Sequence, residues 1–209
     1  MKIFGRWVLA ILFIGLVAAG GWWWWKTDLQ WRPKTITKNQ AEITRILEGA
    51  GYVSPKLAGP KLYMISFRSC PDCIVFKKTY YPRLHAAQVD TRLIELARAD
   101  RNGVPVERAT VAELWINRSW ALSERWDNTP IDAWRAEGIP PADGDIARTA
   151  VVEAGRKMIA DLVPLLKANG VTLAYPTLIW WDKAGNMRTF AWREGVKYDR
   201  VMQELAPGS

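Results

Sequence analysis

Cys70 and Cys73 are the residues whose type and spacing could carry redox chemistry, and they are the only cysteines among the 209 residues of the chain. A structural disulfide stabilises a protein mainly by restricting the unfolded chain, and the restriction grows with the length of the closed loop. A bridge across two residues closes almost no loop, so this pair is a poor structural crosslink. Two neighbouring thiols can instead exchange disulfides with other molecules, because one thiolate attacks and the other releases the product.

Metal binding is the competing interpretation of the pair. A structural zinc site needs four ligands, yet the sequence offers no second cysteine pair and a single histidine, His85. We interpret His85 as a helix-surface residue. Two thiolates also suit Cu(I), so a copper-delivery module remains an alternative. Our prediction is a site with no metal and no cofactor.

The sequence around the pair predicts the elements that position it. Residues Lys61–Phe67 form a compact apolar run, which predicts a buried strand leading into the cysteines. Proline is well tolerated at the first helical position, so Pro71 predicts a helix that Cys70 caps. Because a helix N-terminus stabilises negative charge, Cys70 is the expected nucleophile. Cys73 lies one turn further in and is expected to attack the mixed disulfide and release the substrate.

The rest of the chain alternates predicted helices and strands. A helical block follows the second strand, and two of the strands near the C-terminus are joined by a turn at 183–186. The predicted elements are a helix at 39–50, strands at 61–67 and 91–97, a helical block at 101–149, a helix at 150–169, strands at 172–181 and 187–192, and a helix at 196–205.

This order of elements resembles the thioredoxin fold, an α/β fold, with a helical insertion between its two halves. Two patches carry the resemblance: Phe67–Cys73, with the CxxC motif, and Val171–Trp192, in which Tyr175-Pro176-Thr177 looks like the cis-proline loop. Cys73 and Pro176 are about 100 positions apart, which leaves room for an insertion of the kind found in bacterial DsbA-type and DsbC/DsbG-type proteins.

The resemblance implies a role for each matching residue. Cys70 and Cys73 would be the catalytic pair, and Pro71 and Asp72 between them would tune it. The loop Tyr175-Pro176-Thr177 would bind an extended substrate strand through its backbone. One departure concerns proton transfer, because thioredoxins keep a buried acid six residues before the first cysteine and this chain has Met64 there. That strand therefore offers no proton acceptor for Cys73.

The N-terminal segment predicts a membrane anchor. Residues Trp7–Trp25 carry no charge and would form a helix of about 28 Å, close to the hydrocarbon thickness of a bilayer. Lys2 and Arg6 precede this span, as expected for a cytoplasmic N-terminus, although basic residues at 26–38 leave the orientation open by charge counting alone. A cleaved signal peptide is the alternative, because small residues occur at 17–20.

These observations predict three parts: a membrane anchor at 1–26, a linker with a short helix at 27–60, and a thioredoxin-like domain at 61–209 with its helical insertion at about 101–149. The formal net charge of +8 occurs without a run of five basic residues or a nucleic-acid motif, so we expect no nucleic-acid partner. The expected location is the bacterial inner membrane, with a single span through residues 7–25 and the catalytic domain in the periplasm.

The resemblance implies a thiol–disulfide oxidoreductase that exchanges disulfides with envelope proteins and is served by a membrane redox partner. DsbA-type oxidases carry a histidine where this chain has Asp72, and a carboxylate there disfavours a neighbouring thiolate. We therefore expect a reductase or isomerase rather than an oxidase. The alternative is a redox-inert thioredoxin-fold module that assembles or binds within a cell-envelope machine.

Overall fold

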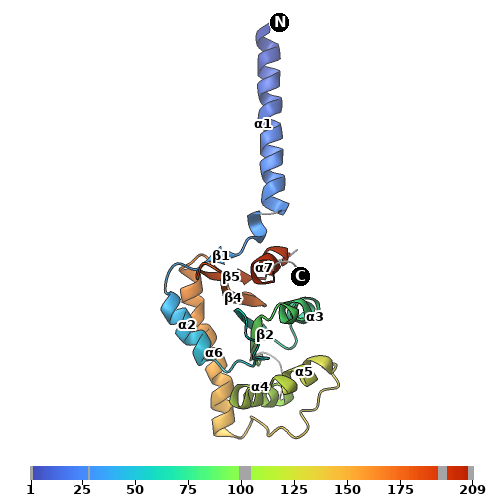
Figure 1. Cartoon of the computed structure of the whole chain (residues 1–209), viewed down its shortest axis with the longest axis vertical. Coiled ribbons are helices and arrows are strands. Elements are labelled where there is room, and N and C mark those ends of the chain that lie inside the picture. The colour runs from blue at the N-terminus through green and yellow to red at the C-terminus, as the bar shows by residue number, and fades with distance from the viewer. Residues whose placement is uncertain (1, 28, 99–104, 193–196, 207–209) are drawn as a thin grey trace.

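The computed structural model describes the backbone of residues 2–27, 29–98, 105–192 and 197–206, and the side chains of these residues from 13 onward except 27 and 30. Figure 1 shows an α/β domain from which one long N-terminal helix extends. The elements are α1 (Lys2–Thr27), η1 (Leu29–Trp31), β1 (Lys34–Thr35), α2 (Gln40–Gly49), β2 (Lys61–Phe67), α3 (Pro71–Ala86), β3 (Asp90–Leu96), α4 (Pro105–Asn117), α5 (Trp120–Asn128), α6 (Ile146–Lys167), β4 (Thr177–Trp181), β5 (Met187–Ala191) and α7 (Asp199–Leu205).

The strands form one sheet in the order β1-β5-β4-β2-β3. Strand β2 pairs in parallel with β3 and antiparallel with β4, and β4 pairs antiparallel with β5. The strand that leads into the cysteines is therefore hydrogen-bonded on both edges. In its pairing with β3, Ser66 lies opposite Glu95.

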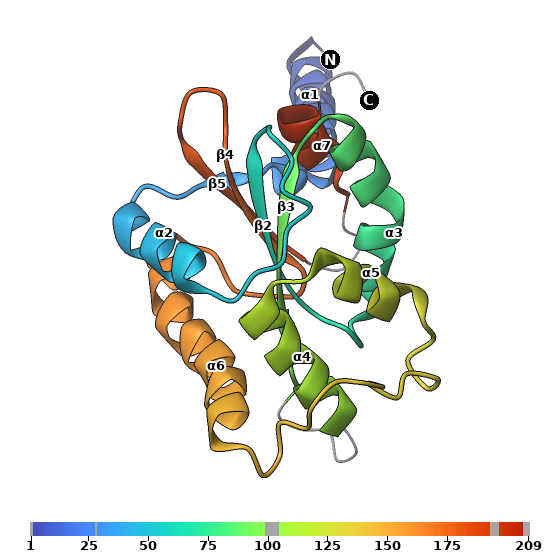
Figure 2. The ribbon, with the colours of Figure 1, turned by 60° about the horizontal axis from the view of Figure 1, so that its bottom comes forward.

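Helices cover both faces of the sheet (Figure 2). Alternate residues of β2 explain this, because Leu62 and Met64 enter one buried cluster with α3 and α7. Tyr63 and Ile65 enter a second cluster with α2 and α6. Since all four side chains are fully buried, β2 is the centre of the core and holds the start of α3 in place.

The helices α4 and α5 are inserted between β3 and α6, and α4 packs against α6 and β3. The chain therefore has an α/β thioredoxin-like fold with a helical insertion, which confirms that part of the predicted fold class. Helix α6 begins at Ile146, earlier than the predicted start at 150. The Asp145 side chain accepts a hydrogen bond from the Arg148 backbone N–H at 3.0 Å, and this cap extends the helix.

The segment predicted as a linker contributes to the domain. Lys34 and Thr35 pair antiparallel with Thr189 and Arg188 of β5, and so add an edge strand to the sheet. The next residue, Ile36, is fully buried in the cluster on the α2 and α6 side of the sheet. Sequence pattern alone did not indicate this strand.

Helix α1 contains the segment predicted as a membrane anchor. Across the part of the chain that the structure describes, there is no helix with both the length and the apolar character needed to cross a membrane. The predicted span at 7–25 includes residues 7–12, whose side chains lie outside the described set.

Candidate functional site

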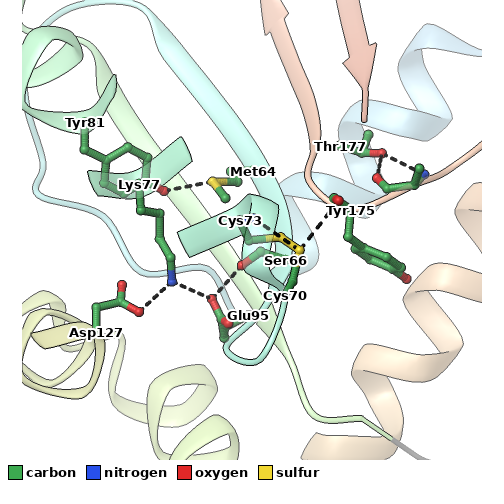
Figure 3. Close-up of a disulfide and its surroundings, with 11 residues drawn as sticks. Met64, Ser66, Cys70, Cys73, Lys77, Tyr81, Glu95, Asp127, Tyr175 and Thr177 are labelled. Carbon is green, nitrogen blue, oxygen red and sulfur yellow. Dashed lines mark hydrogen bonds and ion pairs between the residues drawn. A yellow bond between two sulfur atoms is a disulfide. The ribbon is translucent and has the colours of Figure 1, made fainter. Parts of the chain in front are cut away.

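The two cysteines form a disulfide at the N-terminus of α3 (Figure 3). Cys70 is the N-cap, with extended backbone angles, and Pro71 is the first helical residue. The backbone N–H of Cys73 donates a hydrogen bond to Cys70 Sγ at 3.2 Å. Cys70 is partly exposed, whereas Cys73 is fully buried. The structure therefore places the pair as the sequence predicts.

This placement distinguishes the two sulfurs chemically. The helix end and the Cys73 N–H both favour negative charge on Cys70 Sγ, which lowers the pKa of a thiol. Cys73 lies in the core cluster beside Phe76 and Met64, and burial among apolar side chains raises the pKa of a thiol. The structure therefore gives Cys70 the accessible position at the helix end and Cys73 the buried position in the core.

The second predicted patch lies directly beside the first. The Tyr175–Pro176 peptide bond is cis, and the Tyr175 carbonyl oxygen lies 3.6 Å from Cys70 Sγ. The Tyr175 ring packs against Phe67, with 4.3 Å between ring centroids. The loop therefore presents backbone groups next to the sulfurs. Strand β4 begins only after it, at Thr177 and not at the predicted residue 172, since a proline has no N–H to donate to the sheet.

Thr177, which the resemblance placed in substrate binding, lies in the interior. Its side chain is fully buried, and its Oγ1 donates a hydrogen bond to the Ala174 carbonyl oxygen at 2.5 Å. The Ala174 backbone N–H in turn donates to Thr177 Oγ1 at 3.3 Å. Thr177 therefore holds the shape of the cis-proline loop.

A pocket of about 170 Å³ adjoins the cis-proline loop. Tyr175 and Phe67 form one wall, and side chains of β3, α4 and α6 form the others. Arg156 is the charged residue of this lining, and its Nε is buried and has no hydrogen-bond partner among the described residues. The pocket is lined by Phe67, Leu96, Ala97, Val111, Val152, Gly155, Arg156, Ile159 and Tyr175.

The residues between the cysteines differ in exposure. Pro71 is exposed, and Asp72 is partly exposed in the first turn of α3. The Asp72 charge acts on Tyr198, the residue that precedes α7: burial raises the pKa of Tyr198, and the negative charge of Asp72 adds to that rise. Asp72 therefore acts electrostatically on its surroundings near the motif.

Sequence analysis missed a buried charge cluster beneath the motif, made of Arg68, Lys77, Glu95 and Asp127. Lys77 Nζ lies 2.6 Å from an Asp127 carboxylate oxygen and 3.6 Å from Glu95 Oε2. Ser66 Oγ donates a hydrogen bond to Glu95 Oε2 at 2.6 Å. Glu95 is 2% exposed and Lys77 6% exposed. Two charged residues facing a core are a sign of function or of a specific pairing.

Arg68 joins this cluster to the insertion. Its guanidinium donates hydrogen bonds to the carbonyl oxygens of Trp126 at 3.0 Å, Asp127 at 3.2 Å and Thr129 at 2.7 Å. These carbonyls end α5, where a helix leaves carbonyl oxygens without partners and carries partial negative charge. The residue two positions before Cys70 therefore anchors the end of α5.

Two sequence signals could have revealed the cluster. Glu95 interrupts an apolar strand at a position on the same face as Leu93, and that face packs against α3. Lys77 lies four residues after Cys73, and so on the same side of the helix. Charged residues at such core-facing positions need partners of opposite charge, and here Lys77 and Glu95 are partners of each other.

His85 is not the surface residue that the sequence suggested. It is half-buried, its Nε2 lies 2.7 Å from Thr91 Oγ1, and its ring packs against Tyr81 and Trp120. The reason is tertiary, because α5 of the insertion covers this part of α3. Burial lowers the pKa of His85. Among the residues that the structure describes, no group of three or more His, Cys, Asp and Glu side chains is arranged to hold a metal ion.

Comparison with known proteins identifies similar solved structures only. No protein-family model matches the chain, and no curated protein matches it. The catalytic domain of Proteus mirabilis ScsC superposes with a TM-score of 0.51 at 15% identity, covering 79% of this chain and 93% of that one. Salmonella enterica Typhimurium BcfH gives a TM-score of 0.49 at 15% identity, covering 97% and 93%. Bacillus subtilis BdbD gives 0.45 at 12% identity, covering 83% and 95%. At such identities, the likeness to the ScsC domain supports the thioredoxin-like fold.

Proposed function

We propose that this chain is a thiol–disulfide oxidoreductase of the cell envelope that acts as a reductase or isomerase. One observation carries the proposal. Cys70 is partly exposed, caps α3, accepts a hydrogen bond from the Cys73 backbone N–H and lies 3.6 Å from the Tyr175 carbonyl oxygen. A cysteine used only for structure needs neither accessibility nor a helix end. A nucleophilic one needs both.

The reaction follows from the two sulfurs. The Cys70 thiolate attacks a substrate disulfide, forms a bond to one sulfur and releases the other as a thiolate. Cys73 then loses its proton and attacks Cys70 Sγ, so that the Cys70–Cys73 disulfide forms and the second substrate thiolate leaves. The substrate gains two electrons and the protein loses two. A membrane protein that donates electrons would restore the reduced pair. If a substrate thiol attacks the mixed disulfide first, the result is isomerisation.

Substrate binding is proposed for the loop formed by Tyr175, Pro176 and Thr177. Backbone groups beside the sulfurs suit an extended segment, as in other cases of strand addition. The apolar pocket next to Tyr175 would receive the side chain that neighbours the substrate cysteine. The substrates are thus envelope proteins with a thiol or disulfide in an extended, locally apolar segment.

A disulfide exchange assay tests the function. We expect the full chain to accelerate the reduction of insulin disulfides by dithiothreitol and to restore activity to ribonuclease with scrambled disulfides. The double variant Cys70→Ser/Cys73→Ser is the control and should leave both rates at background. If the unaltered chain also remains at background in both assays, the redox-inert assembly module becomes the better interpretation.

The location is also a proposal. Residues 7–25 carry no charge, and Trp22–Trp25 are exposed on α1, which supports a single inner-membrane anchor with the domain in the periplasm. Disulfides persist in the periplasm, so exchange chemistry has substrates there. Alkaline phosphatase fused after Ser209 should be active, and a cytoplasmic reporter fused there should be inactive. Activity of the cytoplasmic reporter alone would contradict this orientation.

A further inference from the structure

The buried cysteine presents a chemical problem that the motif itself does not solve. Cys73 has to lose a proton before it can attack Cys70 Sγ, yet it is fully buried in an apolar cluster. In a low-dielectric interior, such a proton needs an acceptor nearby. The strand before the motif has Met64 at the position where thioredoxins keep a buried acid, and Met64 Sδ accepts a hydrogen bond from the Tyr81 hydroxyl at 3.2 Å.

An acid is present on the neighbouring strand. Glu95 lies opposite Ser66 in the parallel pairing of β2 with β3, and both side chains lie on the sheet face that α3 covers. Figure 3 shows Ser66 and Glu95 together beneath the disulfide. Glu95 Oε2 accepts from Ser66, whereas Glu95 Oε1 is buried and has no hydrogen-bond partner among the described residues. A buried carboxylate oxygen without a donor is suited to accept a proton.

We propose that Glu95 takes the proton from Cys73 during disulfide exchange, and that Asp127 of the inserted helix α5 controls this transfer by holding Lys77. This inference rests on the proposed function and names the residues that would move its proton. The step is balanced: Cys73–SH and the Glu95 carboxylate become the Cys73 thiolate and protonated Glu95. The thiolate then forms the bond to Cys70 Sγ and expels the substrate sulfur.

The role of Asp127 follows from the distances around Lys77. The ammonium lies nearer to Asp127, at 2.6 Å, than to Glu95, at 3.6 Å. If Lys77 were free to pair fully with Glu95, it would hold that carboxylate ionised and make it a weaker base. Burial raises the pKa of Glu95 and the charge of Asp127 adds to this rise, whereas Lys77, Ser66 and Arg68 oppose it. The insertion thus strengthens Glu95 as a base.

Two members of the charge cluster, Lys77 and Asp127, border a pocket. A pocket of about 350 Å³ lies between α3 and α5, and Lys77 and Asp127 are part of its wall. Its other walls include Tyr81, His85 and Glu124. The groups that face Glu95 are Ser66 from β2, Lys77 and Tyr81 from α3, Arg68 before α3, and Asp127 from α5. Glu95 does not line this pocket itself, so the proposal places the return of its proton to solvent on the side of Lys77 and Asp127.

The test separates the two chemical steps in stopped-flow, single-turnover exchange between the reduced full chain and a peptide disulfide. Formation of the mixed disulfide reports Cys70, and its resolution reports Cys73. We expect Glu95→Gln to leave formation within twofold and to slow resolution at least tenfold at pH 7. Resolution in the unaltered chain should level off above the pKa of Glu95, whereas in Glu95→Gln it should rise about tenfold per pH unit until Cys73 itself ionises.

Two further variants keep the test independent of folding. Asp127→Asn should move the midpoint of the resolution profile to lower pH and lower its plateau, because Lys77 then pairs with Glu95. Glu113→Gln breaks a 2.8 Å ion pair between α4 of the insertion and Arg148 of α6, and should change neither step. If Glu95→Gln fails to fold, the midpoint in Asp127→Asn decides the matter.

The outcomes distinguish this inference from the proposed function. The proton-transfer role is overturned if Glu95→Gln leaves the ratio of the two rates and the pH profile of resolution unaltered while the unaltered chain still exchanges disulfides. If Glu95→Gln does not fold, the same result in Asp127→Asn overturns it. If the unaltered chain forms no mixed disulfide at all, the proposed function fails with it.

Discussion

Replacing Cys70 by serine will abolish disulfide exchange, whereas replacing Cys73 by serine will trap covalent complexes with substrates through Cys70. The reason is the placement of the two sulfurs. Cys70 is partly exposed at the N-terminus of α3, and its sulfur accepts a hydrogen bond from a backbone N–H. We therefore expect Cys70 to be the thiolate that attacks. Without Cys73, the mixed disulfide has no internal thiol to resolve it. Net reduction of substrate disulfides by both variants should fall to the uncatalysed rate.

The rate of alkylation measures the difference in reactivity between the Cys70 and Cys73 thiols without a substrate. With reduced protein near neutral pH and a low concentration of iodoacetamide, Cys73→Ser should be labelled rapidly at Cys70. Cys70→Ser should be labelled slowly, because its remaining thiol is fully buried. Unfolding both variants in denaturant should equalise the two rates, which controls for the number of thiols. A faster reaction of Cys73 in the folded protein would mean that the helix end does not govern reactivity here.

Replacing Asp72 by histidine will make the Cys70–Cys73 couple more oxidising. A carboxylate in the first turn of α3 disfavours a thiolate on the neighbouring cap, and a protonated histidine favours one. Lowering the pKa of Cys70 by one unit stabilises the reduced form by about 1.4 kcal/mol. For a two-electron couple this raises the potential by about 30 mV. We expect a rise of at least this size, measured by equilibration with glutathione at pH 7.

Asp72→Asn provides the matched control because it removes the charge without adding a positive one. Its reduction potential should lie between those of the unaltered chain and Asp72→His. High salt should reduce the differences, since Asp72 is partly exposed and its field is screened. Identical potentials in all three proteins would remove the electrostatic reason for preferring a reductase or isomerase, and would leave the exchange chemistry of the cysteines unaffected.

The sequence by itself determined the local part of the site. The apolar run Lys61–Phe67 and the proline after Cys70 are enough to predict a strand, a cap and a helix, because each depends on neighbours a few residues away. The same holds for the pattern Tyr175-Pro176-Thr177, which pointed to the loop now seen 3.6 Å from Cys70 Sγ. From the sequence, only the resemblance to the thioredoxin fold predicted that this loop lies next to the cysteines.

Tertiary structure alone decided what surrounds the sulfurs. The edge strand Lys34–Thr35 exists because β5, about 150 residues later, offers unpaired backbone groups to it. The contacts of Glu95 with Ser66 and Lys77 join segments 29 and 18 residues apart, and Asp127 comes from the insertion. Spacing along a chain cannot predict such pairs, because buried charges select partners by proximity in the packed core. The residues that react were therefore readable from the sequence, and the buried charges beneath them became visible only once the helices had packed on the sheet.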